Sequence, residues 1–338
     1  MKVRTRYAPS PTGFMHIGNL RTAIFEYLLA KKYNGDFILR IEDTDQEREV
    51  EGAIDFIYNT LDLCGFKIDE GPNNEGNFGP YIQSKRKDIY KEYALKLVEM
   101  GKAYYCFCSE EELTKMREKA DARKKPFLYD GRCSRLSKEK IEENLKNNVP
   151  YVIRQKMPKE GVTIVEDLIY GKVKIDNSIL DDQILLKSDG FPTYNFANVI
   201  DDHLMEITHV IRGKEYLDQT AKYNLLYEAF GWEKPTYIHV AMVLGEDGNK
   251  LSKRNGDASF MDLYNEGYLP EAIVNYLSLL GWSPETNQEV FSMEELISNF
   301  NEERISKSSS QYDVKKLKWF NHQYINKMDD EKYEEAEV

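Results

Sequence analysis

Residues 3–28 read VRTRYAPSPTGFMHIGNLRTAIFEYL, and this stretch predicts a strand, a tight turn and a helix in succession. Arginines alternate with less polar side chains over residues 3–8, as in a short strand, and the prolines and glycine of residues 9–13 end it. Apolar side chains then recur at the spacing of one helix face, at Leu20, Ala23, Ile24, Tyr27 and Leu28. Because residues 37–41 read as a second apolar strand, the stretch predicts a β-α-β unit and hence a parallel sheet.

The turn before this helix has the features of a phosphate site. The first N–H groups of a helix lack partners within the helix, and the helix dipole favours an anion beside them. Gly18 has no side chain, so a nucleotide can approach the backbone there, and His16 can donate a hydrogen bond to a phosphate oxygen. A histidine beside a glycine is more often structural, so this stretch alone leaves both interpretations open.

A second stretch far along the chain, Lys250-Leu251-Ser252-Lys253-Arg254, makes the phosphate interpretation specific. It lies in a polar loop, residues 245–256, after a predicted strand at residues 237–243. The two stretches together resemble the paired ATP-binding motifs of class I aminoacyl-tRNA synthetases, although the first motif ends His-Ile-Gly-Asn where the class pattern has a second histidine.

Two further stretches narrow the resemblance to one branch of that class. The run Ala8-Pro9-Ser10-Pro11-Thr12-Gly13 and the later run Arg40-Ile41-Glu42-Asp43-Thr44-Asp45 resemble the glutamyl/glutaminyl branch, and the bacterial-type glutamyl-tRNA synthetases most of all. The likeness extends from residue 2 to about residue 325.

The resemblance implies the fold class and a division into domains. We expect an α/β protein: a Rossmann-type parallel-sheet catalytic domain with an inserted α+β acceptor-binding domain and a C-terminal helical stem-contact region. The catalytic domain would occupy residues 1–103 and 191–256, the insert 104–190 and the helical region 257–325, followed by a charged tail at 326–338. We expect the catalytic body alone, without the anticodon-binding domains of the family.

The resemblance also implies the roles of individual residues. It makes His16, Lys250 and Lys253 the catalytic residues. The residues expected to bind ATP are His16, Gly18, Asn19, Val243, Lys250, Ser252, Lys253 and Arg254. The residues expected to bind glutamate are Arg6, Tyr194 and Arg212 at its side-chain carboxylate, and Ser10, Glu42 and Asn198 at its backbone end.

Charge supports glutamate as the amino acid. An arginine binds a carboxylate through two parallel hydrogen bonds, and two arginines in one pocket would leave neutral glutamine with too little charge to pair.

The function implied is the ATP-dependent attachment of L-glutamate to the 3′ end of tRNA(Glu) through a glutamyl-adenylate. Little covalent work would fall to the protein, whose residues would align the reactants and stabilise charge on the phosphates. Magnesium would bridge the phosphates of ATP, held mostly by them and by water. In the family, glutamate activation needs bound tRNA. We expect a cytoplasmic monomer.

Three other functions compete with this one. A short paralogue that glutamylates a modified tRNA base is the nearest, but it generally lacks the lysine loop found here at residues 250–254. A small-molecule nucleotidyltransferase would not need the insert or the helical end. A non-catalytic RNA-binding module would not need His16, Gly18, Arg6 and Arg212 together with that loop.

Composition and charge argue against a membrane protein and against a protein that coats nucleic acid. No apolar run approaches the ~18 residues of a membrane span, and the N-terminus lacks the apolar core of a signal peptide. The net charge of −12, from 46 basic and 58 acidic residues, argues against non-specific coating of nucleic acid. Contact with RNA would be confined to local patches, such as Arg304, Lys307, Lys315, Lys316 and Lys318 near the end.

The cysteines point to a possible metal site. Cys64 is expected in the core, whereas Cys106, Cys108 and Cys133 supply three of the four ligands that structural zinc requires. Some relatives have a histidine two residues after the last cysteine, where this chain has Arg135. Tyr129 is the candidate fourth ligand, as in a glutamyl-queuosine-type paralogue. Zinc and three free thiols both remain open.

Overall fold

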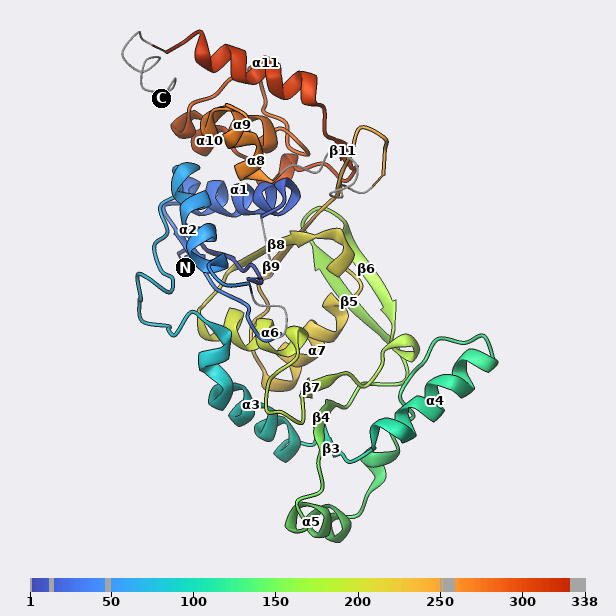
Figure 1. Cartoon of the computed structure of the whole chain (residues 1–338). Helices are drawn as coiled ribbons and strands as arrows, with labels where there is room; N and C mark the ends of the chain where they lie inside the picture. The colour runs from blue at the N-terminus through green and yellow to red at the C-terminus, as the bar shows by residue number, and fades with distance from the viewer. Residues whose placement is uncertain (1, 12–14, 46–49, 250, 252–258, 329–338) are drawn as a thin grey trace.

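A parallel sheet at the centre of the molecule carries the strands that the sequence predicts. The computed structural model describes the chain except residues 1, 12–14, 46–49, 250, 252–258 and 329–338. The elements described are β1 (Arg4–Tyr7), α1 (Ile17–Lys32), β2 (Asp36–Leu39), α2 (Ala53–Leu63), α3 (Lys87–Glu99), β3 (Ala103–Cys106), α4 (Glu110–Ala122), α5 (Lys138–Lys146), β4 (Val152–Gln155), β5 (Val162–Asp167), β6 (Gly171–Asp176), β7 (Ile184–Leu186), α6 (Tyr194–Leu204), β8 (His209–Gly213), α7 (Thr220–Phe230), β9 (Thr236–Val240), β10 (Val243–Leu244), α8 (Phe260–Asn265), α9 (Pro270–Ser278), α10 (Met293–Asn299), β11 (Ser310–Gln311) and α11 (Val314–Ile325), with short 3-10 helices between some of them (Figure 1).

The sheet has two halves that meet between β1 and β8. Strand β1 pairs in parallel with β2, and β8 pairs in parallel with β9. The halves are joined where the N–H of Thr208 donates to the carbonyl of Arg4 at 3.0 Å. One half continues from β1 through α1 to β2, and the other from β8 through α7 to β9, so the chain leaves this junction in opposite directions. Such a switch point is where open α/β sheets bind ligands.

Helix α1 is buried almost all round, although its sequence shows one clear apolar face. It packs on β1 and β8 on one side and on α9 and α10 on the other (Figure 1). Its buried surface includes two charged side chains, Arg21 and Glu26, which are 4% and 2% exposed. Two charged side chains inside a core helix require partners, and both belong to the site described below.

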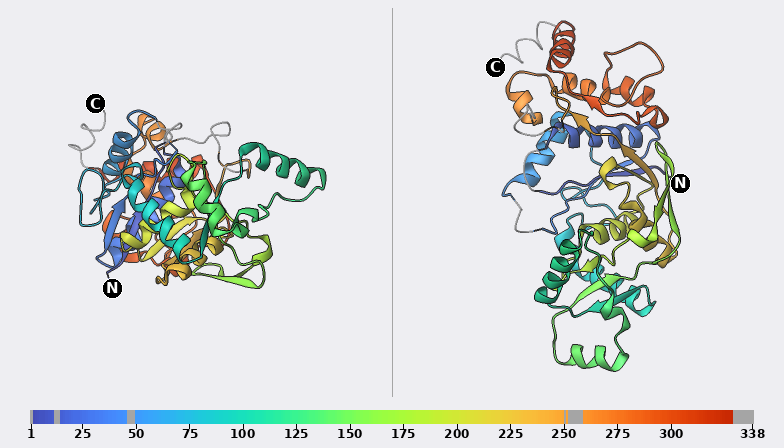
Figure 2. Two further views of the ribbon diagram at one scale, coloured as in Figure 1. Left: turned by 90° about the horizontal axis from the view of Figure 1, so that it is seen from below. Right: turned by 90° about the vertical axis from the view of Figure 1, so that its right-hand side faces the viewer.

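The segment after α3 forms a lobe that projects from the sheet. Strands β3, β4 and β7 form a small antiparallel sheet, and α4 and α5 extend from it at the far end from α11 (Figures 1 and 2). The hairpin β5–β6 belongs to the central sheet and not to the sheet of the lobe. Strand β5 pairs with β9, with Asp167 opposite Tyr237, so the sheet runs across the domain boundary expected at residue 190.

Helices α8 to α11 cover the other end of the molecule, above α1 (Figure 1). The sequence pattern beyond residue 257 predicts helices throughout, but the two-residue strand β11 interrupts them and pairs in parallel with β10. Within the part of the chain that the structure describes, no helix has the length and apolar character needed to cross a membrane.

Candidate active site

A cavity of about 790 Å³ opens at the junction of the two half-sheets, bounded by the ends of β1, β8 and β9 and by the start of α1. This volume lies within the usual range for small-molecule sites. Nine of the residues predicted from the sequence line it: Arg6, Ser10, His16, Gly18, Asn19, Glu42, Tyr194, Arg212 and Val243. Asn198 is buried, 2% exposed, and its Nδ2 donates to the carbonyl of Tyr194 at 2.8 Å. Lys250, Ser252, Lys253 and Arg254 lie outside the described residues.

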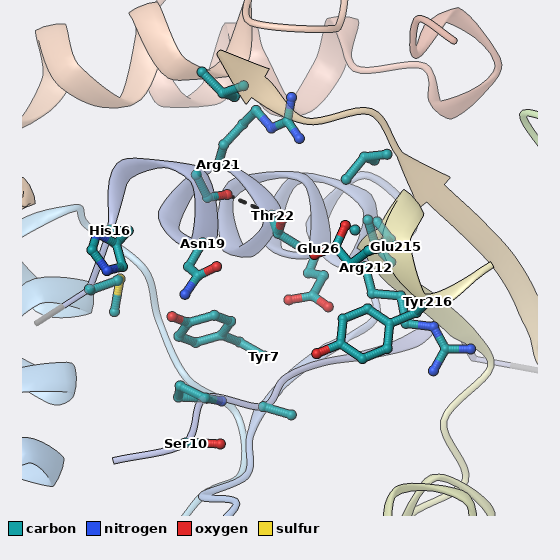
Figure 3. A pocket seen from close by; sticks show the side chains of 18 of the residues that line it. Tyr7, Ser10, His16, Asn19, Arg21, Thr22, Glu26, Arg212, Glu215 and Tyr216 are labelled. Atoms are coloured by element: carbon teal, nitrogen blue, oxygen red, sulfur yellow. Dashed lines mark hydrogen bonds between the residues drawn. The ribbon is translucent and has the colours of Figure 1, made fainter. Parts of the chain in front are cut away.

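One end of the cavity is the N-terminus of α1. His16 is the N-cap residue, in an extended conformation, and its carbonyl accepts the first helical hydrogen bond from Leu20 at 2.9 Å. A Cβ built on Gly18 would meet no protein atom within 4 Å, so the space beside this residue belongs to the cavity. His16 and Asn19 lie at this end, away from Arg212 and Tyr216 (Figure 3).

Glu42 brings a buried carboxyl group to the wall of the cavity. It follows β2, is 4% exposed and is bonded by Arg40, whose Nη2 lies 3.0 Å from Oε1. Burial raises the pKa of Glu42, although Arg40 and Arg6 act in the opposite direction. Arg40 is fully buried and also donates to Asp202 at 2.7 Å.

Arg6 is already engaged by carboxylates. Its Nε donates to Asp202 at 2.9 Å and its Nη1 to Glu26 at 3.2 Å. The pKa values of these two carboxyl groups shift in opposite directions. Burial raises the pKa of Glu26 well above its ordinary range, whereas Arg6 and Arg40 lower the pKa of Asp202 in spite of its burial. Asp202, which also accepts from Arg40, is thus the ionised partner of Arg6, and the carboxyl of Glu26 points toward the space between Tyr7 and Tyr216 (Figure 3).

Arg212 occupies the opposite end of the cavity in a different environment. Its guanidinium lies over the rings of Tyr223, Tyr216 and Tyr237, at 4.5, 5.7 and 5.5 Å from their centroids. Among the residues that the structure describes, it forms no ion pair with a carboxylate. Arg6 and Arg212 both line the cavity as predicted, but among the described residues only Arg6 of the two is paired with carboxylates.

A third arginine, Arg21, connects the site to the C-terminal helices through hydrogen bonds. Its Nη1 donates to the carbonyl of Leu280 after α9, and its Nη2 to the carbonyl of Ala241 after β9, at 3.0 and 2.5 Å. Burial lowers its pKa to about 10. In Figure 3 its guanidinium points away from Glu26 and toward the C-terminal helices.

The cysteine cluster forms a separate centre in the projecting lobe. The sulfur atoms of Cys106, Cys108 and Cys133 all lie within 4.8 Å of one another, and all are free thiols. The hydroxyl of Tyr129 lies 3.3 Å from the sulfur of Cys106 and 3.2 Å from that of Cys108. A tetrahedral zinc with Zn–S bonds of about 2.3 Å separates its sulfurs by ~3.8 Å, close to the 3.6 Å between Cys108 and Cys133. The donor set therefore fits zinc, and Cys64 is buried elsewhere as predicted.

The sequence did not reveal the second set of residues around the cavity. Glu26, Asp202, His239 and Asp167 are fully or nearly fully buried and contact the arginines directly or through one another. Glu26 could have been identified from the sequence, because a glutamate in the middle of a strongly apolar helix indicates a special role. Arg40 lies in the run of residues 40–45 that carries the resemblance. No local pattern distinguishes Asp167 or His239 from other strand residues.

Comparison with known proteins identifies the family of the chain. The family model of tRNA synthetases class I (E and Q), catalytic domain, matches residues 2–319. The chain therefore belongs to the class I tRNA synthetases of the glutamate and glutamine family.

Particular relatives point to one member of that family. The chain is 62% identical over 327 residues to the glutamate–tRNA ligase of Clostridium novyi, covering 97% of this chain and 66% of the relative. It is 60% identical over 324 residues to that of Clostridium tetani, with 96% and 66% coverage. A crystal structure of a glutamate tRNA ligase from Elizabethkingia meningosepticum in complex with its amino acid has a TM-score of 0.93 and 42% identity, over 97% of this chain and 70% of that one. The chain thus spans about two thirds of the length of these relatives.

Proposed function

We propose that the chain activates L-glutamate with ATP and transfers it to the 3′ end of tRNA(Glu). The observation that carries the proposal is one cavity with a helix N-terminus at one end, a buried carboxylate in Glu42 and an arginine without an ion-pair partner among the described residues, Arg212. These three groups suit a phosphate, an ammonium and a carboxylate respectively. The relatives named above, at 60% identity or more, support the same reaction.

In this mechanism the protein binds and aligns the reactants. The N–H groups at the start of α1 and the ring of His16 would hold phosphate oxygens of ATP, and Gly18 would let them approach the backbone. Lys250 and Lys253 would stabilise the departing pyrophosphate. Magnesium, when bound, would add charge stabilisation and would be held by the phosphates and water.

The amino acid would bind across the other half of the cavity. Glu42, with Ser10 and Asn198, would hold the backbone end of glutamate, and Arg212, with Arg6 and Tyr194, its side-chain carboxylate. The α-carboxylate would then lie toward His16, where attack on the α-phosphorus displaces pyrophosphate. Effective alignment of this kind contributes much of the rate in such reactions.

The tRNA and the zinc ion are the remaining proposed partners. The lobe with α4 and α5 would hold the acceptor end, and the helices α8 to α11 would contact the stem. In the described structure, Arg304 donates to the carbonyls of Ser283 and Pro284, and Lys316 pairs with Glu289, so these two are engaged within the protein. Zinc held by Cys106, Cys108, Cys133 and Tyr129 would stabilise the lobe.

Pyrophosphate exchange tests the proposal. Exchange should depend on ATP and glutamate and should require tRNA(Glu), and glutamate should then appear on the tRNA. Exchange with glutamate in the absence of tRNA, together with no charging of the 3′ end, would favour the paralogue that modifies a base. No exchange with glutamate under any condition would contradict the proposal.

A further inference from the structure

Arg212 and His239 are opposite residues in two paired strands. They are register partners of β8 and β9, and the Nε of Arg212 donates to the Nε2 of His239 at 3.2 Å. The Nη2 of Arg212 donates to the hydroxyl of Thr220 at 2.9 Å, and this hydroxyl donates onward to the carbonyl of Tyr216. Two nitrogens of the guanidinium are therefore held by acceptors that carry no charge.

Asp167 fixes His239 from the other side. One carboxylate oxygen lies 2.7 Å from the Nδ1 of His239 and 3.0 Å from its backbone N. The other oxygen accepts from the backbone N–H groups of Ile169 and Tyr170, at 2.9 and 2.8 Å. The side chains of Asp167 and His239 are both 0% exposed. The carboxylate is thus immobilised by four hydrogen bonds at the end of β5.

This chain of contacts requires one form of the imidazole. An N–H of Arg212 can be accepted at Nε2 only if that nitrogen carries a lone pair, so the ring proton must lie on Nδ1. Burial lowers the pKa of His239, which keeps the ring neutral. Burial would raise the pKa of Asp167, but the hydrogen bond from His239 and those from the backbone lower it, so the carboxylate stays ionised and holds the Nδ1 proton.

The arrangement leaves the charge of Arg212 available to the cavity. A direct carboxylate partner would offset the charge of the guanidinium and occupy its donors, as Asp202 occupies the Nε of Arg6. Here the imidazole of His239 lies between the carboxylate of Asp167 and the guanidinium. Asp167 therefore orients the guanidinium without occupying the donors that a ligand needs. An arginine held in one geometry loses less conformational entropy when it binds a carboxylate through two hydrogen bonds.

We propose that Asp167 and His239 are positioning residues, which orient the Arg212 guanidinium so that it can bind the side-chain carboxylate of the substrate. The inference rests on the proposed function for the nature of that substrate. Neither residue lines the cavity, and both act through Arg212.

Asp167→Asn is the first test. An amide cannot accept from both the ring and the backbone N–H groups that now surround the carboxylate, and it favours the tautomer with the proton on Nε2. That proton would face the donors of Arg212. Replacing the carboxylate of an Asp–His pair is known to select the wrong tautomer in this way. With saturating ATP and tRNA, we expect the KM for glutamate to rise about tenfold or more, the scale of one lost charge-assisted hydrogen bond.

Two substitutions at His239 separate positioning from structure. In His239→Gln, one amide can accept from Arg212 and donate to Asp167, so the KM for glutamate should stay within about threefold of the parent. In His239→Leu, both bonds are lost and the KM should rise as in Asp167→Asn. His203→Leu is the matched control, because His203 stacks on Trp232 in the same half of the protein and does not line the cavity.

Two further measurements complete the experiment: the KM for ATP, and the increase in melting temperature when glutamate is added. If the two residues position Arg212, the KM for ATP stays unchanged in Asp167→Asn and His239→Leu. In both variants glutamate then raises the melting temperature by less than it does in the parent. Equal changes in both KM values, or a failure of Gln to restore what Leu removes, would overturn the inference. A parent protein that does not exchange pyrophosphate with glutamate would contradict the proposed function instead, whatever the variants do.

Discussion

Arg40 donates two hydrogen bonds to the same oxygen of Glu42, from Nη2 at 3.0 Å and from Nε at 3.3 Å. The second oxygen, Oε2, is buried and has no hydrogen-bond partner among the residues that the structure describes. A buried carboxylate oxygen without a partner costs free energy, so its persistence at a cavity wall indicates a site for a cationic group.

Glu42→Gln should weaken glutamate binding selectively. The amide keeps the size of the side chain and an acceptor for Arg40 but removes the charge that would face the substrate ammonium. We expect the KM for glutamate to rise by about tenfold or more, with the KM for ATP unchanged, since a charged hydrogen bond contributes ~1.5–3 kcal/mol. The control is Glu70→Gln, because Glu70 is also bound by an arginine, Arg4 at 2.9 Å, but does not line the cavity. Equal KM values for parent and Glu42→Gln would disprove the assignment.

Gly18→Ala should affect ATP and not the fold. The added methyl group would meet no protein atom within 4 Å, and alanine favours a helix by about 1 kcal/mol over glycine. The melting temperature should therefore stay the same or rise. If phosphates approach the backbone at this residue, the KM for ATP should rise at least about tenfold, as expected for a methyl group that keeps the phosphate from its hydrogen bonds. Unchanged ATP kinetics would place the nucleotide elsewhere.

Arg212→Ala should reduce discrimination between glutamate and glutamine. Removing a buried charged partner costs ~2–5 kcal/mol for the substrate that uses it. That substrate is glutamate, because an amide N–H₂ of glutamine would face the donors of the guanidinium. We expect kcat/KM for glutamate to fall far more than kcat/KM for glutamine. A ratio that does not move would show that Arg212 does not contact the side chain of the substrate.

Metal analysis tests the cysteine cluster. Protein purified without chelators should contain about one zinc per chain, and Cys106→Ser should lose it, because a structural zinc needs four ligands. The Cys64→Ser variant is the control, since Cys64 is buried away from the cluster. Tyr129→Phe asks separately whether the phenol is a ligand. A preparation without metal, in which the thiols of the cluster titrate freely, would contradict the zinc proposal.

Stability should fall on mild acidification. Burial lowers the pKa of His203, His209 and His239. The unfolded chain therefore binds protons at these sites at a higher pH than the folded protein does. Their contribution is complete above the unfolded pKa of about 6.5 and is lost as the pH falls through the lowered folded values. Around His239 the charged groups are Asp167, Arg212 and Glu215.

Urea titrations between pH 7.5 and 5 would measure this loss of stability. The denaturation midpoint of the parent should decrease with pH, and His239→Gln should decrease less steeply because it lacks one of the three histidines. Identical slopes for the two proteins would show that folding does not lower the pKa of His239.

The sequence predicts the strands and the helix at the start of the chain because each carries its own local signal. Alternation predicts β1, and the apolar spacing after residue 16 predicts α1, with ends that differ from the observed ones by a few residues at most. The parallel pairing of β1 and β2 follows from the connection between them, and the structure confirms it. Motifs likewise locate the cavity, because Gly18, Glu42 and Arg212 fall in recognisable patterns.

What the sequence does not predict are the contacts between distant strands. Arg212 and His239 are 27 residues apart and meet because β8 and β9 pair in one register. A shift by one residue would turn one of the side chains to the other face. The same limit applies to Glu26, whose carboxyl group meets Arg6 of β1, 20 residues earlier in the chain. These long-range contacts decide which of the arginines is available to a ligand.

The pairing of β5 with β9 has a consequence for building chimaeras of this protein. Residues 104–190 look like an exchangeable module, since they interrupt the catalytic domain. Yet Asp167 lies within that block and, through His239, supports an arginine outside it. A graft of the whole block would transfer a support of the amino-acid pocket along with the projecting lobe, and its removal would expose the edge of β9 to pairing with other chains. An exchange that leaves the pocket intact would keep the β5–β6 hairpin with its host and replace the parts on either side of it.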